Sequence, residues 1–529
     1  MKPLFLALLF LLTVTWNATA QEHPWSDRVF YEIFVRSFYD SDGDGIGDLQ
    51  GVIEKLDYLN DGDSSTMTDL GVTGLWLMPV MQSPSYHGYD VIDYFQIEED
   101  YGTNEDFLTL IDEAHARGMI VIVDLVMNHT SVEHPWFVAS AEGDPEYADW
   151  YVWSDESLTY RGPWGQQVWI PRNGRSYYAV FWDGMPDLNY NNPEVTEEMY
   201  NIARFWLEDM GVDGFRLDAI KHLVEEGNGQ ENTPSSHAWM QSFNAFINSV
   251  DADALTVGEA WSTSYEAAEY VENDEVDLVF EFDLATAMVQ SARQGNRASV
   301  AAIQRRTLSL YPEARYATFL TNHDQNRVMS ELHGNVGAAK VAASLLLTAP
   351  GLPFIYYGEE IGMQGQKPDE RIRTPMQWDA TEITAGFTTG RPWQPLSTGN
   401  EDGINVADQM DDPDSLWSHY RNLIHVRSGY EALQWGEFAM VKSEVRALYS
   451  FLRYTDDQTL LVVINLSDEP VEDYALTLET GTLTDVTGAS LVFGNGEAAV
   501  PTVNADGGFD AYVPMDVLPA YSTTIIELR

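Results

Sequence analysis

The sequence predicts an α/β fold: a (β/α)8 or TIM barrel with a small domain inserted after its third strand, followed by a C-terminal antiparallel β-sandwich domain. Eight short β-rich apolar runs precede residue 360, and amphipathic helical patterns lie between them. The connection after the third run is much longer than the others. After residue 430, short strand patterns follow one another without intervening helices.

The eight candidate strands are rich in β-branched and aromatic residues and are bounded by turn-forming residues. They span residues 29–37, 72–79, 120–127, 214–219, 255–259, 278–282, 316–321 and 353–357. Apolar residues at helical spacing predict helices between them, for example over residues 104–117, 194–209 and 336–348. An open doubly wound sheet is the alternative, but we find no Gly-rich phosphate loop that would favour it.

The long connection and the change of pattern near residue 430 set the expected domain boundaries. Residues 21–128 and 188–430 would form the barrel, residues 129–187 the inserted domain and residues 431–529 the sandwich. The inserted segment contains six of the sixteen tryptophans. We expect most of them to pack its own small core, while some could offer flat platforms for ligand rings.

The first twenty residues have the pattern of a secretory signal peptide. Lys2 is followed by an apolar run over residues 4–14 and by the small-residue sequence Ala18-Thr19-Ala20. A membrane anchor is the alternative, but this run is too short to span a bilayer. The sequence therefore predicts a secreted protein, extracellular or periplasmic, cleaved near Ala20. It contains no cysteine, so it has neither a disulfide framework nor a cysteine for lipid attachment.

The charge balance excludes several classes of partner. Asp and Glu total 83 against 28 Lys and Arg, which gives a formal net charge of −55. Such a chain repels nucleic acid and anionic membranes, so we expect neither as a partner. A neutral polysaccharide carries no electrostatic penalty. We find no dedicated dimerisation segment and expect a monomer.

Polar residues follow four of the predicted strands, and active sites of (β/α)8 barrels lie at these C-terminal strand ends. They are Asn128 and His129; Arg216, Asp218, Lys221 and His222; Glu259; and His323 and Asp324. Any one of them could be a structural salt bridge or cap. Four polar ends converging on one rim are harder to explain in that way.

Two of these acids suit the hydrolysis of a glycosidic bond, which needs a carboxylate nucleophile and a carboxylic acid as proton donor. Asp218 and Glu259 follow neighbouring strands, which lie about 4.8 Å apart, and retaining glycosidases hold their two carboxyl groups about 5–5.5 Å apart. Arg216 lies two residues before Asp218 on the same face, where its charge would keep Asp218 ionised. Glu259 would need a raised pKa to serve as the acid.

Other residues on this rim could hold the sugar. Asp324 could bind hydroxyl groups as the ring distorts, and His129 and His323 could donate hydrogen bonds to hydroxyls of the same ring.

Four segments resemble the conserved regions of the α-amylase family, glycoside hydrolase family 13, and occur in the order found in that family. They are DLVMNH (124–129), GFRLDAIKH (214–222), GEAW (258–261) and TNHD (321–324). The resemblance extends from about residue 25 to the C-terminus. It implies a nucleophile at Asp218, an acid/base at Glu259 and a transition-state stabiliser at Asp324. The residues implied to bind substrate are Tyr89, His129, Arg216 and His323 around the attacked glucose, and Lys221 and His222 on the leaving-group side.

Three further segments bear on the substrate. Residues 185–189 (MPDLN) resemble the motif of a subfamily intermediate between oligo-1,6-glucosidases and neopullulanases. Residues 373–379 (RTPMQWD) resemble exo-acting α-glucosidases and trehalose synthases, whereas residues 86–89 (YHGY) resemble endo-acting amylases. Exo-acting relatives carry an Asp where Tyr86 stands, and that Asp captures a terminal glucose.

We therefore expect an endo-acting α-amylase that cleaves α-1,4 bonds of starch, glycogen and maltodextrins. The alternatives are an exo-acting α-glucosidase, oligo-1,6-glucosidase or transglycosylase on malto-oligosaccharides and, more remotely, a non-catalytic glycan-binding protein.

An acidic loop after the first strand has the spacing of a calcium site. Asp40, Asp42, Asp44 and Asp48 occupy positions 1, 3, 5 and 9, and Ile46 would give its carbonyl at position 7. A metal-free acidic turn is the alternative, but its carboxylates would repel one another. Related enzymes hold Ca2+ or Mg2+ in this loop. The resemblance also implies a second calcium site, formed by Asn128, Asp187 and the carbonyl of His222.

Overall fold

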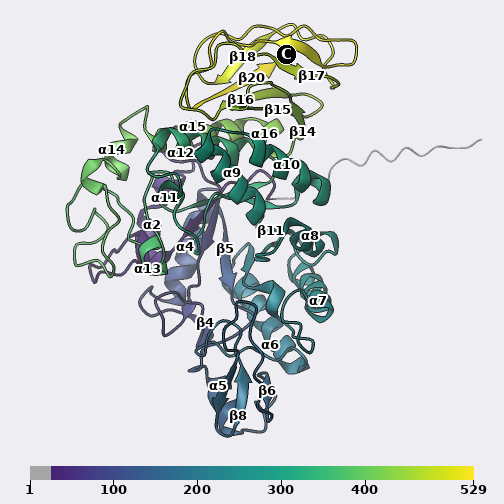
Figure 1. Cartoon of the computed structure of the whole chain (residues 1–529). Helices are drawn as coiled ribbons and strands as arrows, with labels where there is room; N and C mark the ends of the chain where they lie inside the picture. Colours follow the sequence, from purple (N-terminus) through teal and green to yellow (C-terminus); the bar gives the residue numbers. More distant parts are fainter. Residues whose placement is uncertain (1–24) are drawn as a thin grey trace, which may run out of the picture.

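The computed structural model describes residues 25–529, and a closed barrel of eight parallel strands forms its centre (Figure 1). The strands are β1 (Phe30–Ile33), β2 (Gly74–Leu77), β5 (Ile120–Leu125), β9 (Gly214–Leu217), β10 (Leu255–Gly258), β11 (Leu278–Val279), β12 (Ala317–Thr318) and β13 (Leu352–Tyr356). Their order in the sheet is β11-β10-β9-β5-β2-β1-β13-β12, and a parallel bridge between Phe280 and Ala317 joins the two ends. The predicted barrel is confirmed: seven predicted strands contain one of these shorter strands, and the eighth, predicted over residues 353–357, overlaps β13, which begins one residue earlier.

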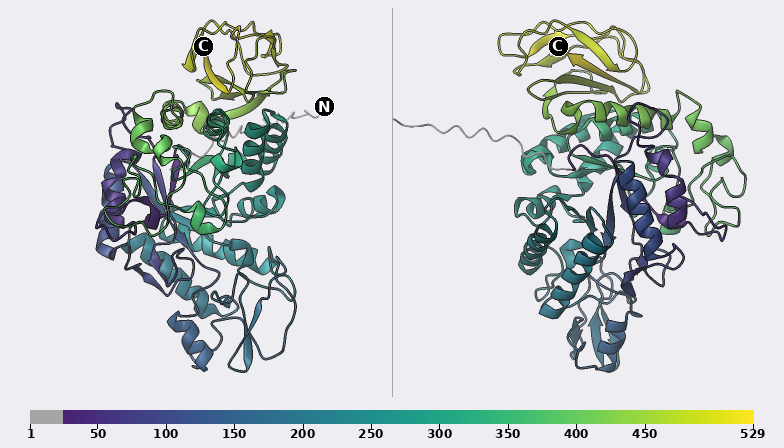
Figure 2. Two further views of the ribbon diagram at one scale, coloured as in Figure 1. Left: turned by 60° about the vertical axis from the view of Figure 1, so that its left-hand side comes forward. Right: turned by 180° about the vertical axis from the view of Figure 1, so that it is seen from behind.

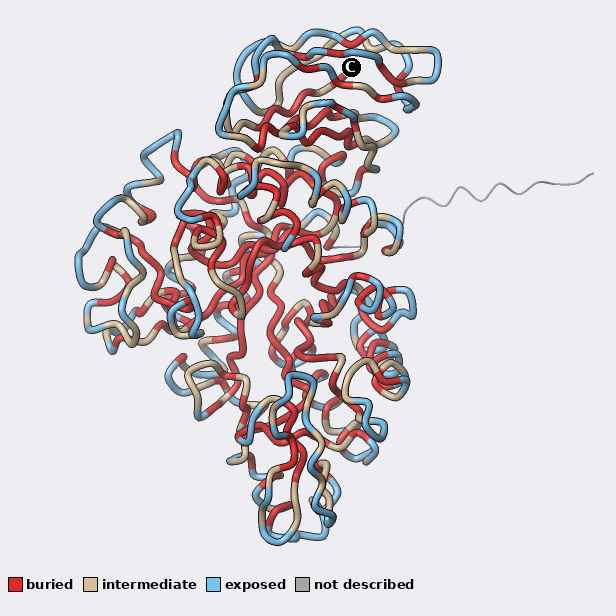
Figure 3. Tube along the Cα trace, in the orientation of Figure 1, coloured by how far each residue is buried: buried red, intermediate tan, exposed pale blue. Residues whose placement is uncertain are grey.

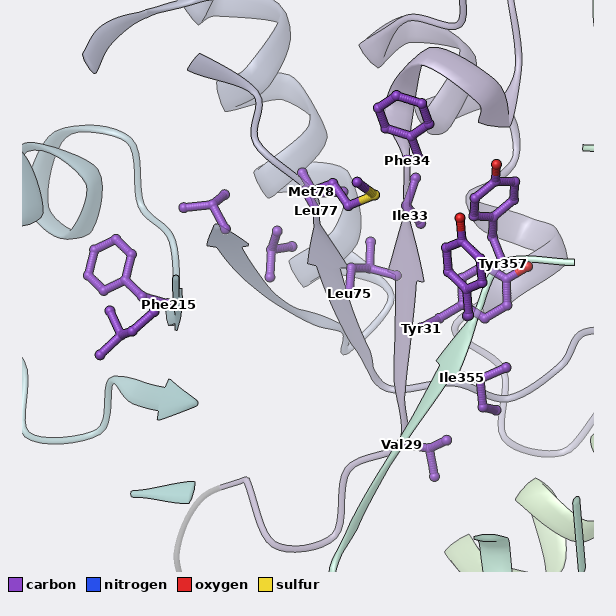
Figure 4. Packing of buried hydrophobic residues seen from close by; sticks show 14 of the residues in the cluster. Val29, Tyr31, Ile33, Phe34, Leu75, Leu77, Met78, Phe215, Ile355 and Tyr357 are labelled. Atoms are coloured by element: carbon purple, nitrogen blue, oxygen red, sulfur yellow. The ribbon is translucent and has the colours of Figure 1, made fainter. Parts of the chain in front are cut away.

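The strands are apolar on both faces because one face lines the barrel and the other packs against helices. Side chains alternate along a strand, so Phe30 and Trp76 belong to an inner cluster while Tyr31 and Leu75 belong to the outer core. Figure 4 shows part of this outer core on β1 and β2. Figure 3 shows the buried strands at the centre and exposed segments around them.

Helices surround the barrel, except for α5, which lies in the segment inserted after β5 (Figure 1). The longer ones are α4 (Asn104–Ala116), α5 (Pro135–Glu142), α6 (Pro193–Arg204), α7 (Pro234–Val250), α8 (Ser264–Glu272), α9 (Phe282–Gln294), α10 (Ala298–Leu310), α12 (Val336–Thr348) and α15 (Leu416–Gly429). A capping box between Thr103 and Asp106 starts α4. Helix α12 has the predicted bounds, whereas the helix predicted over residues 194–209 changes to a π-helical turn at Phe205–Asp209.

Short helices complete the connections. They are α1 (Val35–Phe38), α2 (Leu49–Glu54), α3 (Leu56–Leu59), α11 (Val328–Glu331), α13 (Asp369–Ile372), α14 (Val406–Met410) and α16 (Glu431–Gln434), with 3-10 turns at Ile220–His222, Pro312–Ala314 and Asn400–Asp402. A two-stranded sheet of β3 (Met81–Gln82) and β4 (Asp93–Ile97) follows β2.

The segment between β5 and α6 forms the end of the molecule farthest from the C-terminal strands (Figures 1 and 2). It contains α5 and an antiparallel sheet of β6 (Trp153–Ser154), β8 (Arg175–Tyr178) and β7 (Trp169–Arg172). Trp150 and Trp169 are buried there, whereas Trp164 is 57% exposed and Trp182 is 49% exposed. Some tryptophans of this segment are therefore buried in its core, and others lie at its surface.

The C-terminal strands form a separate antiparallel layer over α12, α15 and α16 (Figure 2). Its larger sheet is β14 (Glu437–Val441), β15 (Leu448–Tyr454), β16 (Thr459–Asn465), β20 (Ser522–Leu528) and β18 (Ala489–Phe493); the smaller pairs β17 (Leu476–Leu478) with β19 (Phe509–Tyr512). Buried residues from both sheets, including Leu461 and Phe509, share one core. The predicted antiparallel C-terminal architecture is confirmed.

The signal peptide predicted over residues 1–20 lies outside the described residues and stays a prediction. Among residues 25–529, no helix combines the length and the apolar character needed to cross a membrane.

Candidate active site

Arg216 is the centre of a buried charge cluster at the C-terminal ends of the barrel strands. Its Nη1 lies 2.7 Å from Asp124 Oδ1 and 2.6 Å from Asp218 Oδ1, and its Nη2 lies 2.9 Å from Glu259 Oε2. The parallel register of β9 and β10 pairs Arg216 with Val257, so Glu259 emerges beside Asp218. One guanidinium thus holds the two predicted catalytic carboxylates side by side.

The surroundings of Asp218 and Glu259 give the two acids different pKa values. Burial raises the pKa of Glu259 to about 7, against the lowering effect of Arg216. Burial also raises the pKa of Asp218 to about 6, because it outweighs the favourable contact with Arg216. The sequence predicted that Arg216 keeps Asp218 ionised, but it did not show that burial opposes this effect. The pKa of Asp218 is still lower than that of Glu259, which is the order that a nucleophile and an acid need.

The third acid, Asp324, is strongly ionised. Its Oδ1 lies 2.8 Å from Arg373 Nη2 and its Oδ2 lies 3.2 Å from His323 Nε2. Burial alone would raise the pKa of Asp324, but the charges of His323 and Arg373 hold it well below its usual range. Its side chain is 31% exposed, compared with 9% for Asp218, so part of it is open to a ligand.

Beside Arg373, His323 carries a second positive charge that faces Asp324. Burial alone would lower its pKa, but Asp324 and Glu32 raise it to about 9, so the ring is protonated at neutral pH. Its Nδ1 donates to Glu32 Oε1 at 2.5 Å, and its Nε2 lies 2.7 Å from the hydroxyl of Tyr89. That hydroxyl donates to Asp124 Oδ2 at 3.1 Å. A continuous hydrogen-bonded chain therefore runs from Glu32 to Arg216.

Four residues of this network were not among the predicted site residues: Glu32, Trp76, Asp124 and Arg373. The indole of Trp76 donates to Asp124 Oδ2 at 3.2 Å. Glu32 and Asp124 each stand as one acid in an otherwise apolar strand. A lone buried acid is unfavourable without a partner, and this was the signal that could have revealed them.

Two of the three predicted sugar-binding histidines, His129 and His222, are neutral, in contrast to His323. Burial lowers the pKa of His129 to about 3, and its Nε2 lies 3.1 Å from the carbonyl oxygen of Tyr89. Burial lowers the pKa of His222 to about 4. The Nδ1 of His222 lies 2.9 Å from the carbonyl of Gln230, while its buried Nε2 has no hydrogen-bond partner among the described residues.

Lys221 lies on the side of the acid, Glu259. Its Nζ donates to Glu231 Oε1 at 2.6 Å and to the carbonyl of Trp261 at 2.9 Å. The indole of Trp261 is 43% exposed and stacks on Phe282, with ring centroids 4.5 Å apart. Lys221 therefore positions the segment that follows Glu259.

The predicted calcium loop gathers three of its four acids. Carboxylate oxygens of Asp40, Asp42 and Asp48 lie within 4.8 Å of one another. Asp44 stands outside this group, and its Oδ1 accepts the N–H of Ile46 at 2.7 Å. Asp40 is buried and accepts two loop N–H groups at 2.7 Å. All-oxygen donors of this kind fit Ca2+ or Mg2+.

Two side chains of the predicted second metal site, Asn128 and Asp187, also lie together. Asn128 Nδ2 donates to Asp187 Oδ2 at 3.1 Å, and both residues are buried. Burial raises the pKa of Asp187 well above its usual range. The Oδ1 of Asn128 has no hydrogen-bond partner among the described residues. A cation would satisfy this oxygen and neutralise the carboxylate, so these residues fit the predicted ion.

The paired acids on neighbouring strands of this (β/α)8 barrel are what a glycoside hydrolase requires, and comparison with known proteins agrees. Residues 32–436 match the α-amylase catalytic domain, so this chain belongs to the α-amylase family. It is 39% identical to α-amylase 3 of Dictyoglomus thermophilum, covering 88% of this chain and 90% of that protein. An oligo-1,6-glucosidase of Heyndrickxia coagulans is 34% identical, covering 90% of this chain and 98% of that protein. The crystal structure of an α-amylase from H. orenii has a TM-score of 0.82 and 41% identity, covering 96% of this chain and 100% of that one.

Proposed function

We propose that this glycoside hydrolase is an endo-acting α-amylase that cleaves internal α-1,4 bonds of starch, glycogen and maltodextrins. The observation that carries the proposal is Tyr86. Its ring stacks on Trp393, with centroids 5.4 Å apart, and both residues are partly exposed. An aromatic pair suits the face of a further glucose unit, whereas a carboxylate there would suit a chain end.

The proposed mechanism follows from the protonation states of Asp218 and Glu259. Asp218, as the carboxylate, attacks the anomeric carbon, while Glu259 gives its proton to the leaving oxygen. Asp218 then holds a covalent glycosyl unit. Glu259, now ionised, takes a proton from water, whose oxygen displaces Asp218. Two displacements at one carbon retain its configuration. The ionised Asp324 would bind hydroxyls of the distorted ring, and Arg216 would stabilise whichever of the two catalytic acids is ionised.

An exo-acting α-glucosidase is the second candidate. Two observations support it. The chain is similar to an oligo-1,6-glucosidase, and residues 373–379 resemble exo-acting α-glucosidases. Arg373, the first residue of that segment, contacts Asp324 in the active site. Secretion, supported by the signal-peptide pattern of residues 1–20, and a monomeric state, supported by the lack of a dedicated dimerisation segment in the sequence, complete the proposal.

Digestion of long-chain amylose separates the two candidates. Internal cleavage is expected to abolish the iodine colour while few reducing ends have formed, because each cut shortens the helix that holds iodine. A matched digest with a known exo-acting glucosidase is the reference. Slow loss of colour with steady accumulation of glucose would show that the enzyme works from chain ends.

We also propose that the loop at residues 40–48 binds calcium and thereby stabilises the fold. Removing calcium with a chelator is expected to lower the Tm by roughly 2–3 degrees, since a ligand at a hundred times its Kd adds about 2.7 kcal/mol to the free energy of unfolding. Added Ca2+ should restore the Tm. Differential scanning calorimetry measures this change.

Two variants test the assignment of the loop. Asp42→Asn removes a charge from the group of three acids and should weaken the response of the Tm to calcium. Asp44→Asn, in the same loop but outside the group, is the matched control and should keep more of the response. A wild-type Tm that is the same in chelator and in calcium would refute the proposal. Metal analysis of the intact protein would show whether the Asn128 and Asp187 site adds a second ion.

A further inference from the structure

The predicted calcium loop lies against residues 387–393, a segment between β13 and α15 that is distant in the sequence. The N–H of Asp40 donates to the carbonyl of Phe387 at 3.0 Å. At the other end of the segment, the N–H of Trp393 donates to the carbonyl of Gly45 at 2.8 Å. Main-chain hydrogen bonds therefore join the loop to both ends of this segment.

The side chain of Asp40 contacts the segment as well. Its Oδ2 accepts the hydroxyl of Thr388, and that hydroxyl oxygen accepts the N–H of Gly390 at 2.8 Å. A Cβ atom added at Gly390 would lie 2.2 Å from the carbonyl oxygen of Gly43, so the two main chains are in direct contact. Asp40 is also one of the three acids of the predicted ion site. The same carboxylate thus belongs to the ion site and to the contact with the segment.

Trp393 connects this segment to the active site by hydrogen bonds. Its indole N–H donates to Ser37 Oγ at 3.0 Å, and the hydroxyl of Ser37 donates to the carbonyl of Arg373 at 2.6 Å. The guanidinium of Arg373 holds Asp324 at 2.8 Å. Two hydrogen bonds therefore separate the indole of Trp393 from the residue that holds the third acid of the site.

A row of aromatic rings makes a second connection between Trp393 and the active site. Trp393 stacks on Tyr86, and the centroid of Tyr86 lies 5.4 Å from that of His87. His87 stacks on Tyr89 at 6.2 Å, and Tyr89 stacks on His323 at 5.6 Å. The aromatic pair at Tyr86 is thus continuous with the catalytic centre on one side and with the loop on the other.

The charges of the loop make its shape depend on a cation. Carboxylate oxygens of Asp40, Asp42 and Asp48 lie within 4.8 Å of one another, and like charges at this distance repel. A cation would remove this repulsion and hold the three carboxylates together. Because Asp40 contacts Thr388, a movement of its carboxylate is passed to the segment that ends at Trp393.

We propose that calcium binding in the loop and α-glucan binding at the Tyr86–Trp393 pair are coupled, because the filled loop holds Trp393 in the position that receives a further glucose unit. This inference rests on the proposed α-amylase function and on the proposed ion in the loop. Two ligands that favour the same arrangement strengthen each other, and the coupling is reciprocal. Calcium would then set the affinity for long substrates as well as the stability of the fold.

Calorimetric titration of the intact Asp218→Asn variant, which hardly hydrolyses its substrate, measures this coupling directly. Saturating maltoheptaose is expected to lower the Kd for Ca2+ about fivefold, at the lower end of typical coupling between two sites. Saturating Ca2+ should lower the Kd for maltoheptaose by the same factor. Both titrations are made at one ionic strength, because the chain carries a net charge of −55.

Substitutions in the segment test the route. Trp393→Ala removes the ring but keeps the main-chain N–H that binds the loop, so the Kd for Ca2+ without sugar should change little while the effect of maltoheptaose disappears. Thr388→Val removes the hydroxyl that Asp40 accepts and should bring the coupling factor towards one. Thr389→Val makes the same change at the next residue, which is exposed, and is the matched control that should keep the full factor.

Asp42→Asn separates the loop from the predicted second ion site. It should remove the sugar-dependent binding of Ca2+, although Asn128 and Asp187 are intact. If Asp42→Asn kept the full factor, the coupled ion would lie elsewhere and the inference would fail. Equal Kd values for Ca2+ with and without maltoheptaose in Asp218→Asn would overturn it, as would an unchanged factor in Trp393→Ala. Wild-type protein that does not cleave maltoheptaose would instead refute the proposed function itself.

Discussion

Replacing Asp218 with Asn is expected to lower kcat on starch on the order of 10⁴-fold, with little change in KM. The amide has the same shape as the carboxylate, but it cannot form the covalent glycosyl intermediate. Arg216 still has Asp124 and Glu259 as partners, so the buried charge keeps its compensation. Initial rates on soluble starch, with circular dichroism to compare the folded state, measure the effect.

Asp209→Asn is the control, because it makes the same chemical change on an exposed residue of the π-helical turn that follows α6. It should leave the rate unchanged. If Asp218→Asn retained a tenth or more of the wild-type activity, another residue would be the nucleophile. A wild-type protein without any hydrolytic activity would favour the non-catalytic glycan-binding alternative.

The barrel was predictable because its strands are buried on both faces and therefore appear as short apolar runs. The C-terminal strand ends follow from the same pattern, and Asp218 and Glu259 were found because they stand at two neighbouring ends. Helix α12 was predicted with its observed bounds from the helical spacing of its apolar residues; in the structure Asn335 caps its start.

The long-range partners could not be predicted from local patterns. Glu32 and His323 meet although 291 residues separate them, because β13 pairs with both β1 and β12 and so brings the loop after β12 close to β1. The pKa of Asp218 could not be predicted from the sequence either. The sequence places Arg216 nearby, but the depth of burial, which raises the pKa of Asp218 to about 6, depends on the whole barrel.

The pKa values of Asp218 and Glu259 determine the expected pH dependence of the reaction. The reaction needs Asp218 ionised and Glu259 protonated. The kcat/KM should therefore rise with pH through about 6, where Asp218 loses its proton, and fall through about 7, where Glu259 loses its proton. A narrow maximum between the two values is the expected profile. It is a property of the pair, because Arg216 contacts both acids.

Replacing Glu259 with Gln should remove the falling limb of this profile, since no proton donor remains to be lost. The rate on maltoheptaose should drop about 10²–10⁴-fold, because the leaving oxygen must depart without a proton. Formation of the glycosyl intermediate from an α-maltosyl fluoride should suffer far less, since fluoride departs without needing a proton from this residue. Stopped-flow release of fluoride measures that first step.

The comparison between the two substrates is what assigns the role of Glu259. A general acid acts only where the leaving group needs a proton, so its loss must depend on the leaving group. If Glu259→Gln slowed both substrates by the same factor, Glu259 would act mainly by holding Arg216, which it contacts at 2.9 Å. If the falling limb persisted, a different group would donate the proton, and the pKa of about 7 at Glu259 would reflect only its burial among other acids.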